Sequence, residues 1–275
     1  MADRRDTCAI GVMAKAPQPG RAKTRLCPPL QPVQAAQLSA AFLRDITENI
    51  ALAARSAPIQ GCIAYAPAGA ESCFDGHLAE GTGFVLADGS PPMPSGVQGF
   101  GRCLLHAAQA MFAAGFGAAC LLNSDSPTLP TSVLAAAADA LLAPGERVVL
   151  GPAEDGGYYL LGMQQPHPHL FADIAWSTRE VAAATRARAA ALGLEVITLP
   201  TWYDVDDDAA LARLIADVDD ARPIGALQPY AAPATREQIG RIRLSESSSS
   251  ARFRSVIFII APTIRSGLSS ASRTA

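Results

Sequence analysis

TCAIGVMAKAPQPGRAKTRL, residues 7–26, joins an apolar run of strand length to a loop with four cations, two prolines and a glycine. The run predicts a β-strand over residues 7–15, because it is apolar and is followed by turn-forming residues. The loop contains no carboxylate, so its charge must be balanced by solvent ions, by other parts of the fold or by a ligand. Cations between a strand and a helix favour anion binding, and a solvated basic turn is the alternative.

The rest of the chain alternates apolar runs of strand length with Ala- and Leu-rich segments of helical period. Strands are expected at residues 7–15, 59–66, 83–87, 118–123, 147–151, 157–163 and 194–199, and helices at residues 32–55, 101–114, 131–142 and 178–192. This alternation implies crossover connections and a mostly parallel, twisted sheet covered by helices on both faces. We therefore expect a three-layer α/β/α fold.

The composition is that of a globular protein with little net charge. Hydrophobic residues make up 49% of the 275, which is ample for a sizeable core, and the formal net charge is -3. Because nucleic-acid binding requires an extended basic surface, we expect no nucleic-acid partner. The six cysteines include no C-x-x-C pair and several lie in apolar runs, so we expect reduced thiols and a cytoplasmic protein. The charged start, MADRRD, does not resemble an export signal.

The character of the chain changes near residue 229. QPYAAPATREQ (residues 228–238) is loop-like, and SESSSSARFRS (residues 245–255) is rich in Ser and Arg. SVIFIIAPTI (residues 255–264) is far shorter than the ~20 apolar residues of a membrane span, so we expect no membrane partner. We expect one domain over residues 1–228 and a disordered or atypical tail over residues 229–275.

Four polar loops follow expected strands and should meet at one edge of the sheet. Lys15 ends the first strand, and Asp125, Asp155 and the pair Asp204 and Asp206 follow three later ones. The carboxyl ends of parallel strands lie at the same edge, where open α/β sheets bind their ligands. This arrangement suits a phosphate chain held by Lys and Arg on one side and a divalent metal held by carboxylates on the other.

Each acidic motif also has a purely structural explanation. NSDSPTLP, residues 123–130, could be a turn with helix-capping residues, and DGG, residues 155–157, could be a hairpin turn. Asp206 or Asp207 could begin the next helix. Asp204 and Asp206 would nevertheless share one face of an extended segment, as a metal site with two carboxylates needs.

WSTRE, residues 176–180, overlaps the start of an expected helix. Ser177 and Glu180 have the spacing of a capping box, so we interpret them as capping residues. The four histidines form no persuasive ligand set, and GFGRCL is too short a glycine pattern to predict a dinucleotide site.

Taken together and in order, six motifs resemble the DUF2064 family, also called radical-SAM/selenodomain-associated transferase 1. They are MAKAPQPGRAKTRL, QGFGRCL, NSDSPTLP, GPAEDGGYYLLGM, DIAWSTREV and WYDVDDDAAL. The resemblance covers residues 8 to about 215, and it implies the GT-A fold of nucleotide-diphospho-sugar transferases, related to molybdenum-cofactor guanylyltransferase and phospholactate guanylyltransferase. Two positions depart from the family's pattern: Asn123, where glycine is usual, and Phe100, where an acidic residue and leucine are usual.

The resemblance also implies roles for individual residues. The nucleotide phosphates would be bound by Lys15, Gly20, Lys23, Thr24 and Arg25. Asp125 would be the metal aspartate, and the shared face of Asp204 and Asp206 makes these two the other expected metal ligands. The acceptor would lie against Asp155, Gly156, Gly157, Tyr158 and Trp176. Catalysis would involve Asp125, Asp155 and Lys23.

We therefore expect a transferase, dependent on Mg²⁺ or Mn²⁺, that uses a nucleotide-activated donor and a small-molecule acceptor. With a nucleoside triphosphate, attack at the α-phosphate releases pyrophosphate; with a nucleotide sugar, attack at the anomeric carbon releases a nucleoside diphosphate. The motifs leave both reactions open, and the chain could pair with a second copy as a homodimer. The alternative from another class is a nucleotide-binding partner protein without turnover, associated with a radical-SAM pathway.

Overall fold

The computed structural model describes residues 4–220 and 222–248 of the chain. Within them the strands are β1 (Arg4–Lys15), β2 (Ile59–Ala66), β3 (Gly83–Leu86), β4 (Phe116–Leu122), β5 (Arg147–Pro152), β6 (Tyr158–Met163) and β7 (Glu195–Thr198). The helices there are α1 (Pro32–Ala53), α2 (Phe100–Ala113), α3 (Thr131–Leu142), α4 (Val181–Ala191), α5 (Asp208–Asp220) and α6 (Pro233–Ser248). Short 3-10 turns lie at Thr24–Leu26, Glu71–Phe74 and Pro168–Phe171. Every strand and helix expected from the sequence is present, with only small shifts at the ends.

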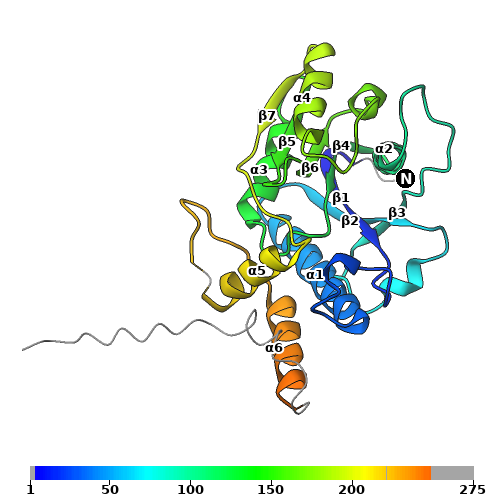
Figure 1. The fold of residues 1–275 in the computed structure, drawn as a ribbon. Coiled ribbons are helices and arrows are strands. Elements are labelled where there is room, and N and C mark those ends of the chain that lie inside the picture. Colours follow the sequence, from blue (N-terminus) through cyan, green and yellow to red (C-terminus); the bar gives the residue numbers. More distant parts are fainter. Residues whose placement is uncertain (1–3, 221, 249–275) are drawn as a thin grey trace, which may run out of the picture.

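The strands form one sheet in the order β3-β2-β1-β4-β6-β5-β7 (Figure 1). Neighbouring strands are parallel except for β6, which runs antiparallel to both β4 and β5. Strand β6 reverses direction because only residues 153–157 join it to β5, and a parallel neighbour needs a crossover of about a dozen residues or more. The predicted mostly parallel sheet is therefore confirmed, with one reversed strand.

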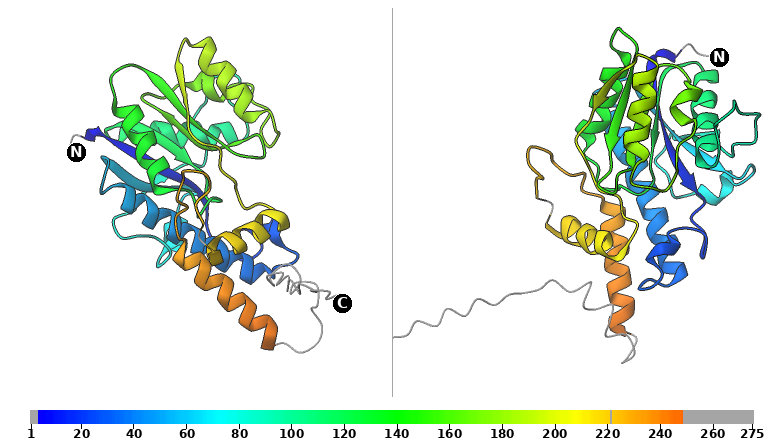
Figure 2. Two further views of the ribbon diagram at one scale, coloured as in Figure 1. Left: turned by 90° about the vertical axis from the view of Figure 1, so that its left-hand side faces the viewer. Right: turned by 45° about the horizontal axis from the view of Figure 1, so that its top comes forward.

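Helices cover both faces of the sheet, which gives three layers (Figures 1 and 2). Ile10 and Val12 of β1 belong to a buried cluster with α1, α3, α5 and α6, whereas Ala9 belongs to a second cluster with α2 and α4. This alternation is the period of an extended strand, whose successive side chains point to opposite faces. The predicted α/β/α fold is confirmed.

The ordered core extends past the expected boundary at residue 228, because α6 packs against α1. Ile239 and Ile242 of α6 are buried in the same cluster as the apolar face of α1. Asp45 of α1 is fully buried and accepts hydrogen bonds from the backbone N–H groups of Ala234 (3.0 Å) and Thr235 (2.7 Å), so one helix caps the other. The sequence of α6 looks loop-like because polar and charged residues outnumber apolar ones in it, although Ile239 and Ile242 are buried. SVIFIIAPTI lies outside the described residues.

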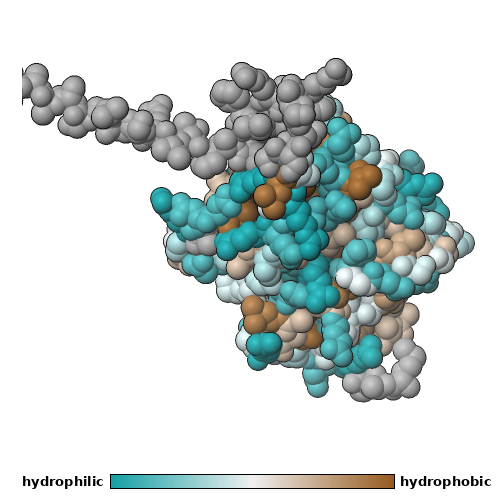
Figure 3. Space-filling view, turned by 90° about the horizontal axis from the view of Figure 1, so that it is seen from below, coloured by the Kyte–Doolittle hydropathy of each residue, from teal (hydrophilic) through white to brown (hydrophobic). Residues whose placement is uncertain are grey.

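Seen from below, the end of the molecule that carries α5 and α6 is mostly hydrophilic, with separate hydrophobic patches (Figure 3). Isolated exposed apolar side chains, such as Val33 and Leu244, are normal on a globular surface. None of the helices in the described ranges is long and apolar enough to cross a membrane.

Candidate functional site

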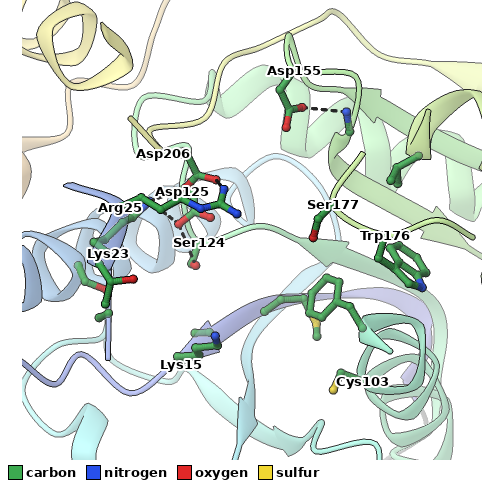
Figure 4. Close-up of a pocket in the computed structure, with 18 of the residues that line it drawn as sticks. Lys15, Lys23, Arg25, Cys103, Ser124, Asp125, Asp155, Trp176, Ser177 and Asp206 are labelled. Atoms are coloured by element: carbon green, nitrogen blue, oxygen red, sulfur yellow. Dashed lines mark hydrogen bonds and ion pairs between the residues drawn. The ribbon is translucent and has the colours of Figure 1, made fainter. Parts of the chain in front are cut away.

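A cavity of about 730 Å³ lies at the carboxyl edge of the sheet, where the sequence places its polar loops (Figure 4). Among the described residues, five cationic and three acidic side chains line it: Lys15, Arg21, Lys23, Arg25 and Arg179, with Asp125, Asp155 and Asp206. A local excess of positive charge in a chain of net charge -3 favours an anionic ligand.

Four of the five residues expected to bind phosphates line the cavity: Lys15, Lys23, Thr24 and Arg25. Gly20 does not; its φ of +74° lets the loop turn in a conformation that favours glycine. The side chain of Arg25 is 72% exposed, and its guanidinium lies 3.4 Å from the Asp206 carboxylate. Lys15 has no ion pair with any residue that the structure describes, so its ammonium is available to an anion.

Lys23 differs from the other cations because its ammonium is buried among oxygens. Its Nζ lies 2.5 Å from Asp125 Oδ1 and 3.5 Å from Asp206 Oδ1, and it donates a hydrogen bond to the Val205 carbonyl at 2.6 Å. The side chain is only 7% exposed, and Nζ lies 5.1 Å from the centroid of the Phe42 ring. In this structure Lys23 therefore neutralises carboxylates.

Two hydrogen bonds, both accepted by backbone carbonyls, bring the acidic segments together. The Val205 N–H donates to the Asp125 carbonyl (2.9 Å), and the Ser126 hydroxyl donates to the Tyr203 carbonyl (2.9 Å). These bonds hold the segment that precedes α5 beside the turn that follows β4. Asp125 and Asp206 consequently lie side by side at the cavity, next to Lys23 (Figure 4).

Asp204 is an expected metal ligand that does not line the cavity. Burial and the charges of Asp155, Asp206 and Asp125 raise its pKa to about 6. Burial and the charge of Asp125 also raise the pKa of Asp206, whereas the charges of Lys23 and Arg25 lower it. The repulsion among these carboxyl groups favours a cation between them.

Two of the three expected metal ligands fit a hard divalent cation. In the ranges that the structure describes, no group of three or more His, Cys, Asp and Glu side chains is arranged to hold a metal ion. Asp125, Asp206 and the Val205 carbonyl instead converge on one point, which Lys23 Nζ occupies. Mg²⁺ prefers oxygen ligands and usually takes one or two carboxylates together with substrate phosphates, so this set of donors suits it.

The DGG motif forms the turn between β5 and β6, as the hairpin-turn alternative predicts. Asp155 Oδ1 accepts a hydrogen bond from the Gly157 N–H (2.8 Å). Gly156 has φ +94°, and a Cβ there would come within 2.2 Å of the Arg179 carbonyl. Asp155, Gly157 and Tyr158 nevertheless line the cavity, whereas Gly156 does not. The turn thus presents a carboxylate on the wall that faces the cationic loop (Figure 4).

An aromatic corner, formed by Phe100 and Trp176, lines the cavity away from Asp125. The two ring centroids are 5.9 Å apart at an interplanar angle of 88°. A Cβ at Gly101 would lie 2.9 Å from Cζ2 of Trp176, so this glycine leaves the space that the indole fills. Phe100 is 49% exposed, which leaves part of its ring open to a ligand. Sequence reasoning assigned Trp176 to the acceptor but gave Phe100 no role, although QGFGRCL already marked its position.

The predicted capping box at residues 177–180 is wrong. Helix α4 begins at Val181 with Glu180 as its N-cap, and no side chain in the part of the chain that the structure describes caps it. Ser177 has φ +63°, which turns the chain before the helix starts and leaves its side chain at the cavity. The Thr178 hydroxyl bonds to the Ala175 carbonyl (2.8 Å) and stabilises this turn instead. At the start of α5, Asp207 accepts from the Ala210 N–H (2.8 Å), as a helix-capping residue does.

These features can be compared with those of known proteins. Residues 49–178 match the family DUF2064, described as "Uncharacterized protein conserved in bacteria". The resemblance drawn from the motifs is thereby confirmed. The DUF2064 match contains Asp125, the Asp155 turn and the aromatic corner, whereas Lys23 and Asp206 lie outside it. The site therefore combines residues of the segment that matches the family with residues from the loops before and after that segment. No curated protein matches the sequence.

Solved structures provide a second comparison. One from Desulfovibrio desulfuricans G20, described as a "putative nucleotide-diphospho-sugar transferase", is 27% identical with a TM-score of 0.68, over 86% of this chain and 97% of that one. This likeness confirms the fold of nucleotide-diphospho-sugar transferases, the GT-A type.

Two other similar structures have lower scores. A CMP:2-keto-3-deoxy-manno-octonic acid synthetase complexed with CTP is 14% identical (TM-score 0.46, over 76% of this chain and 96% of that one). Rv0371c from Mycobacterium tuberculosis H37Rv, in complex with manganese, is 16% identical (TM-score 0.38, over 78% and 98%). At these TM-scores, neither supports a conclusion about this chain.

Proposed function

We propose that the protein is a transferase for a nucleotide-activated donor, with the donor phosphates at the cationic loop and a divalent cation at Asp125 and Asp206. The observation that carries the proposal is the meeting of Lys23 and Arg25 with these two carboxylates at a cavity rich in cations. Cations alone would bind many anions, whereas cations beside paired carboxylates suit phosphates that carry a metal. The likeness to the Desulfovibrio desulfuricans structure supports the same class of reaction.

The donor phosphates are bound by the cations that the structure leaves accessible at the cavity. Arg25 and Arg21 belong to the loop after β1, and Lys15 ends β1 itself. Guanidinium groups donate pairs of hydrogen bonds to phosphate oxygens, and an ammonium adds a compact positive charge. Charges held in place before the reaction stabilise the negative charge that develops on the leaving group.

Asp125 and Asp206 would hold Mg²⁺ or Mn²⁺, with the Val205 carbonyl as a third oxygen. When bound, the cation neutralises phosphate charge and so stabilises the departing pyrophosphate or nucleoside diphosphate. Asp204 does not line the cavity, so it is not among these ligands.

The acceptor lies between the turn after β5 and the aromatic corner. Gly157 and Tyr158 contribute one wall and Trp176 the other. One oxygen of Asp155 is held by the Gly157 N–H, which orients the second oxygen to accept a proton. The acceptor oxygen forms a bond to the α-phosphorus or to the anomeric carbon, the bond to the leaving phosphate breaks, and the acceptor proton passes to Asp155.

A ligand screen tests the proposal. Nucleoside triphosphates and nucleotide sugars are added with and without Mg²⁺, and the melting temperature is measured. A ligand that binds only the folded chain raises it, and we expect one group of donors to do so more strongly with Mg²⁺ than without. The proposal fails if no donor shifts the melting temperature under either condition.

The released product then identifies the reaction. Accumulation of pyrophosphate from the best donor indicates nucleotidyl transfer, and accumulation of a nucleoside diphosphate indicates glycosyl transfer. Saturable binding with no leaving group, whatever the acceptor, supports instead a nucleotide-binding partner protein without turnover.

A further inference from the structure

Each N–H donor of the Lys23 ammonium has an acceptor oxygen nearby. These are Asp125 Oδ1 at 2.5 Å, the Val205 carbonyl at 2.6 Å and Asp206 Oδ1 at 3.5 Å. An ammonium has three donors and no lone pair, so these three oxygens match its full capacity to donate hydrogen bonds. To contact a phosphate of the donor, Lys23 has to leave at least one of these oxygens.

The same three oxygens suit a hard divalent cation. Two carboxylates and a carbonyl are typical ligands of Mg²⁺ and Mn²⁺, and they surround a single point. An ammonium and a metal ion cannot occupy that point together, and their like charges repel each other at short distance. Occupation by one therefore excludes the other.

Lys23 is placed so that it can move between the two positions. Its side chain lines the cavity as well as the oxygen site, and its four-carbon stem is flexible. Arg25 already contacts Asp206 from the solvent side. Lys23 itself has φ +50° and ψ +38°, a left-handed conformation that is unfavourable for a residue with a side chain. Its ion pairs help to hold the loop in this shape.

We propose that Lys23 and the divalent cation are alternative occupants of the oxygen site formed by Asp125, Asp206 and the Val205 carbonyl. In the free protein Lys23 holds the site. Donor phosphates draw Lys23 into the cavity, and the cation takes its place. The identity of the donor rests on the proposed function. A metal alone has to displace Lys23 with no phosphate to receive it, so metal and donor strengthen each other's binding.

The first experiment measures the binding of Mn²⁺ alone to the full chain, by the electron paramagnetic resonance signal of free Mn²⁺. Lys23→Met removes the ammonium and keeps a side chain of similar length. We expect this variant to bind Mn²⁺ at least tenfold more tightly than the parent. Lys15→Met is the matched control: it removes one charge from the same cavity but from a residue without an ion pair in the described ranges. Equal affinities in the two variants would overturn the proposal.

The second experiment needs no substitution, because Lys15 and Lys23 are the two lysines of the chain. Brief acetylation followed by mass spectrometry reports how accessible each amine is. We expect Lys23 to react more slowly than Lys15 in the free protein, and saturating Mn²⁺ to accelerate labelling of Lys23 several-fold without changing Lys15. Lys23 that stays protected at saturating Mn²⁺ would contradict the exchange.

The two proposals can fail separately. If a nucleotide binds with Mg²⁺ while Lys23→Met gains no affinity for Mn²⁺, the exchange is wrong and the proposed function stands. If Lys23→Met gains that affinity but no nucleotide binds, the exchange stands and the proposed function is wrong.

Discussion

Lys23 and Arg25 belong to one loop, but their side chains have different surroundings. The loop sequence suggests two exposed cations, whereas Lys23 is 7% exposed and Arg25 is 72% exposed. A solvated ion pair such as that of Arg25 contributes little to stability, about 0–1 kcal/mol. Removing Lys23 leaves two neighbouring carboxylates without their ammonium, which is destabilising.

Arg25→Ala should weaken nucleotide binding about fivefold or more and leave the melting temperature nearly unchanged, because an exposed guanidinium serves phosphate affinity more than stability. Lys23→Ala should lower the free energy of unfolding by less than the ~3–5 kcal/mol of a fully buried pair, because Asp125 and Asp206 are 29% and 42% exposed. Titration calorimetry and thermal unfolding of both variants check this pair of expectations. Nucleotide affinity equal to that of the parent in Arg25→Ala would remove the loop from the site.

Asp125→Asn keeps the size of the side chain and removes its charge. In the parent, we expect Mg²⁺ to raise nucleotide affinity by about tenfold or more, within the usual range of coupling between two ligands. In the variant this gain should disappear, while affinity without metal stays the same or improves, since a repulsive carboxylate has gone. Titration of nucleotide with and without Mg²⁺ measures both quantities.

Asp139→Asn is the control for that substitution, because Asp139 is an exposed carboxylate on α3 outside the cavity. It should retain the full gain from Mg²⁺. Undiminished coupling in Asp125→Asn would exclude Asp125 as a metal ligand.

At the scale of elements, the aromatic corner depends on close packing between the start of α2 and the segment before α4. Gly101→Ala would place a methyl group 2.9 Å from the indole of Trp176 and 3.0 Å from the Phe171 carbonyl. We expect a loss of stability of about 1–3 kcal/mol and a shift in tryptophan fluorescence, because the indole has to move. Thermal unfolding and emission spectra are the measurements.

Gly240→Ala is a matched control, since, apart from its chain neighbours and the backbone of α6, no atom of the described residues lies within 4 Å of a Cβ at this position. It should stabilise the protein slightly, by about 0.5–1 kcal/mol, and leave the emission unchanged, because alanine favours a helix over glycine. Identical emission in Gly101→Ala and the parent would show that the corner tolerates the methyl group and that Gly101 does not position Trp176.

The elements themselves could be predicted because their patterns are local. Alternating apolar runs and helical periods identified β1 to β7 and α1 to α4, and turn residues marked their ends. Helix α6 was missed because Asp45, its cap, lies on another helix, and because only one of its faces is buried. Tertiary contacts of this kind leave no signal in a short window of sequence.

At the scale of the whole molecule, topology explains which parts of the site could be predicted. Strands of known direction place Lys15 and Asp125 at one edge, and the cavity lies there. Side-chain direction is not fixed by topology: Lys23 turns to the carboxylates, and Asp204 stays outside the cavity. Both outcomes depend on hydrogen bonds between segments about 80 residues or more apart in sequence, such as that of Val205 to Asp125.

The C-terminal boundary can be tested by truncation, and the structure favours an end at residue 248 over one at residue 228. Ending the chain after Gln228 removes α6, exposes the apolar face of α1 that α6 covers and takes away the two N–H donors of the Asp45 carboxylate. Burial of Ile239 and Ile242 alone contributes about 1.5–3 kcal/mol each, a large share of the ~5–15 kcal/mol that stabilises a domain. We expect this shorter chain to unfold at a much lower temperature or to aggregate.

A chain that ends after Ser248 should behave differently, because it keeps α6 and every residue of the cavity. We expect its melting temperature to stay within a few degrees of the parent's and its response to nucleotide and Mg²⁺ to be unchanged. Asp45→Ala in the chain that ends after Ser248 should lower the free energy of unfolding by about 1–3 kcal/mol, because two N–H groups of α6 lose their acceptor. This variant separates the contribution of capping from that of the apolar contact. Thermal unfolding of the full chain and of the two truncated chains measures the differences. Equal stability of the chain that ends after Gln228 would show that α6 adds nothing to the core, and loss of the nucleotide response on removing residues 249–275 would show that this segment contributes to the site.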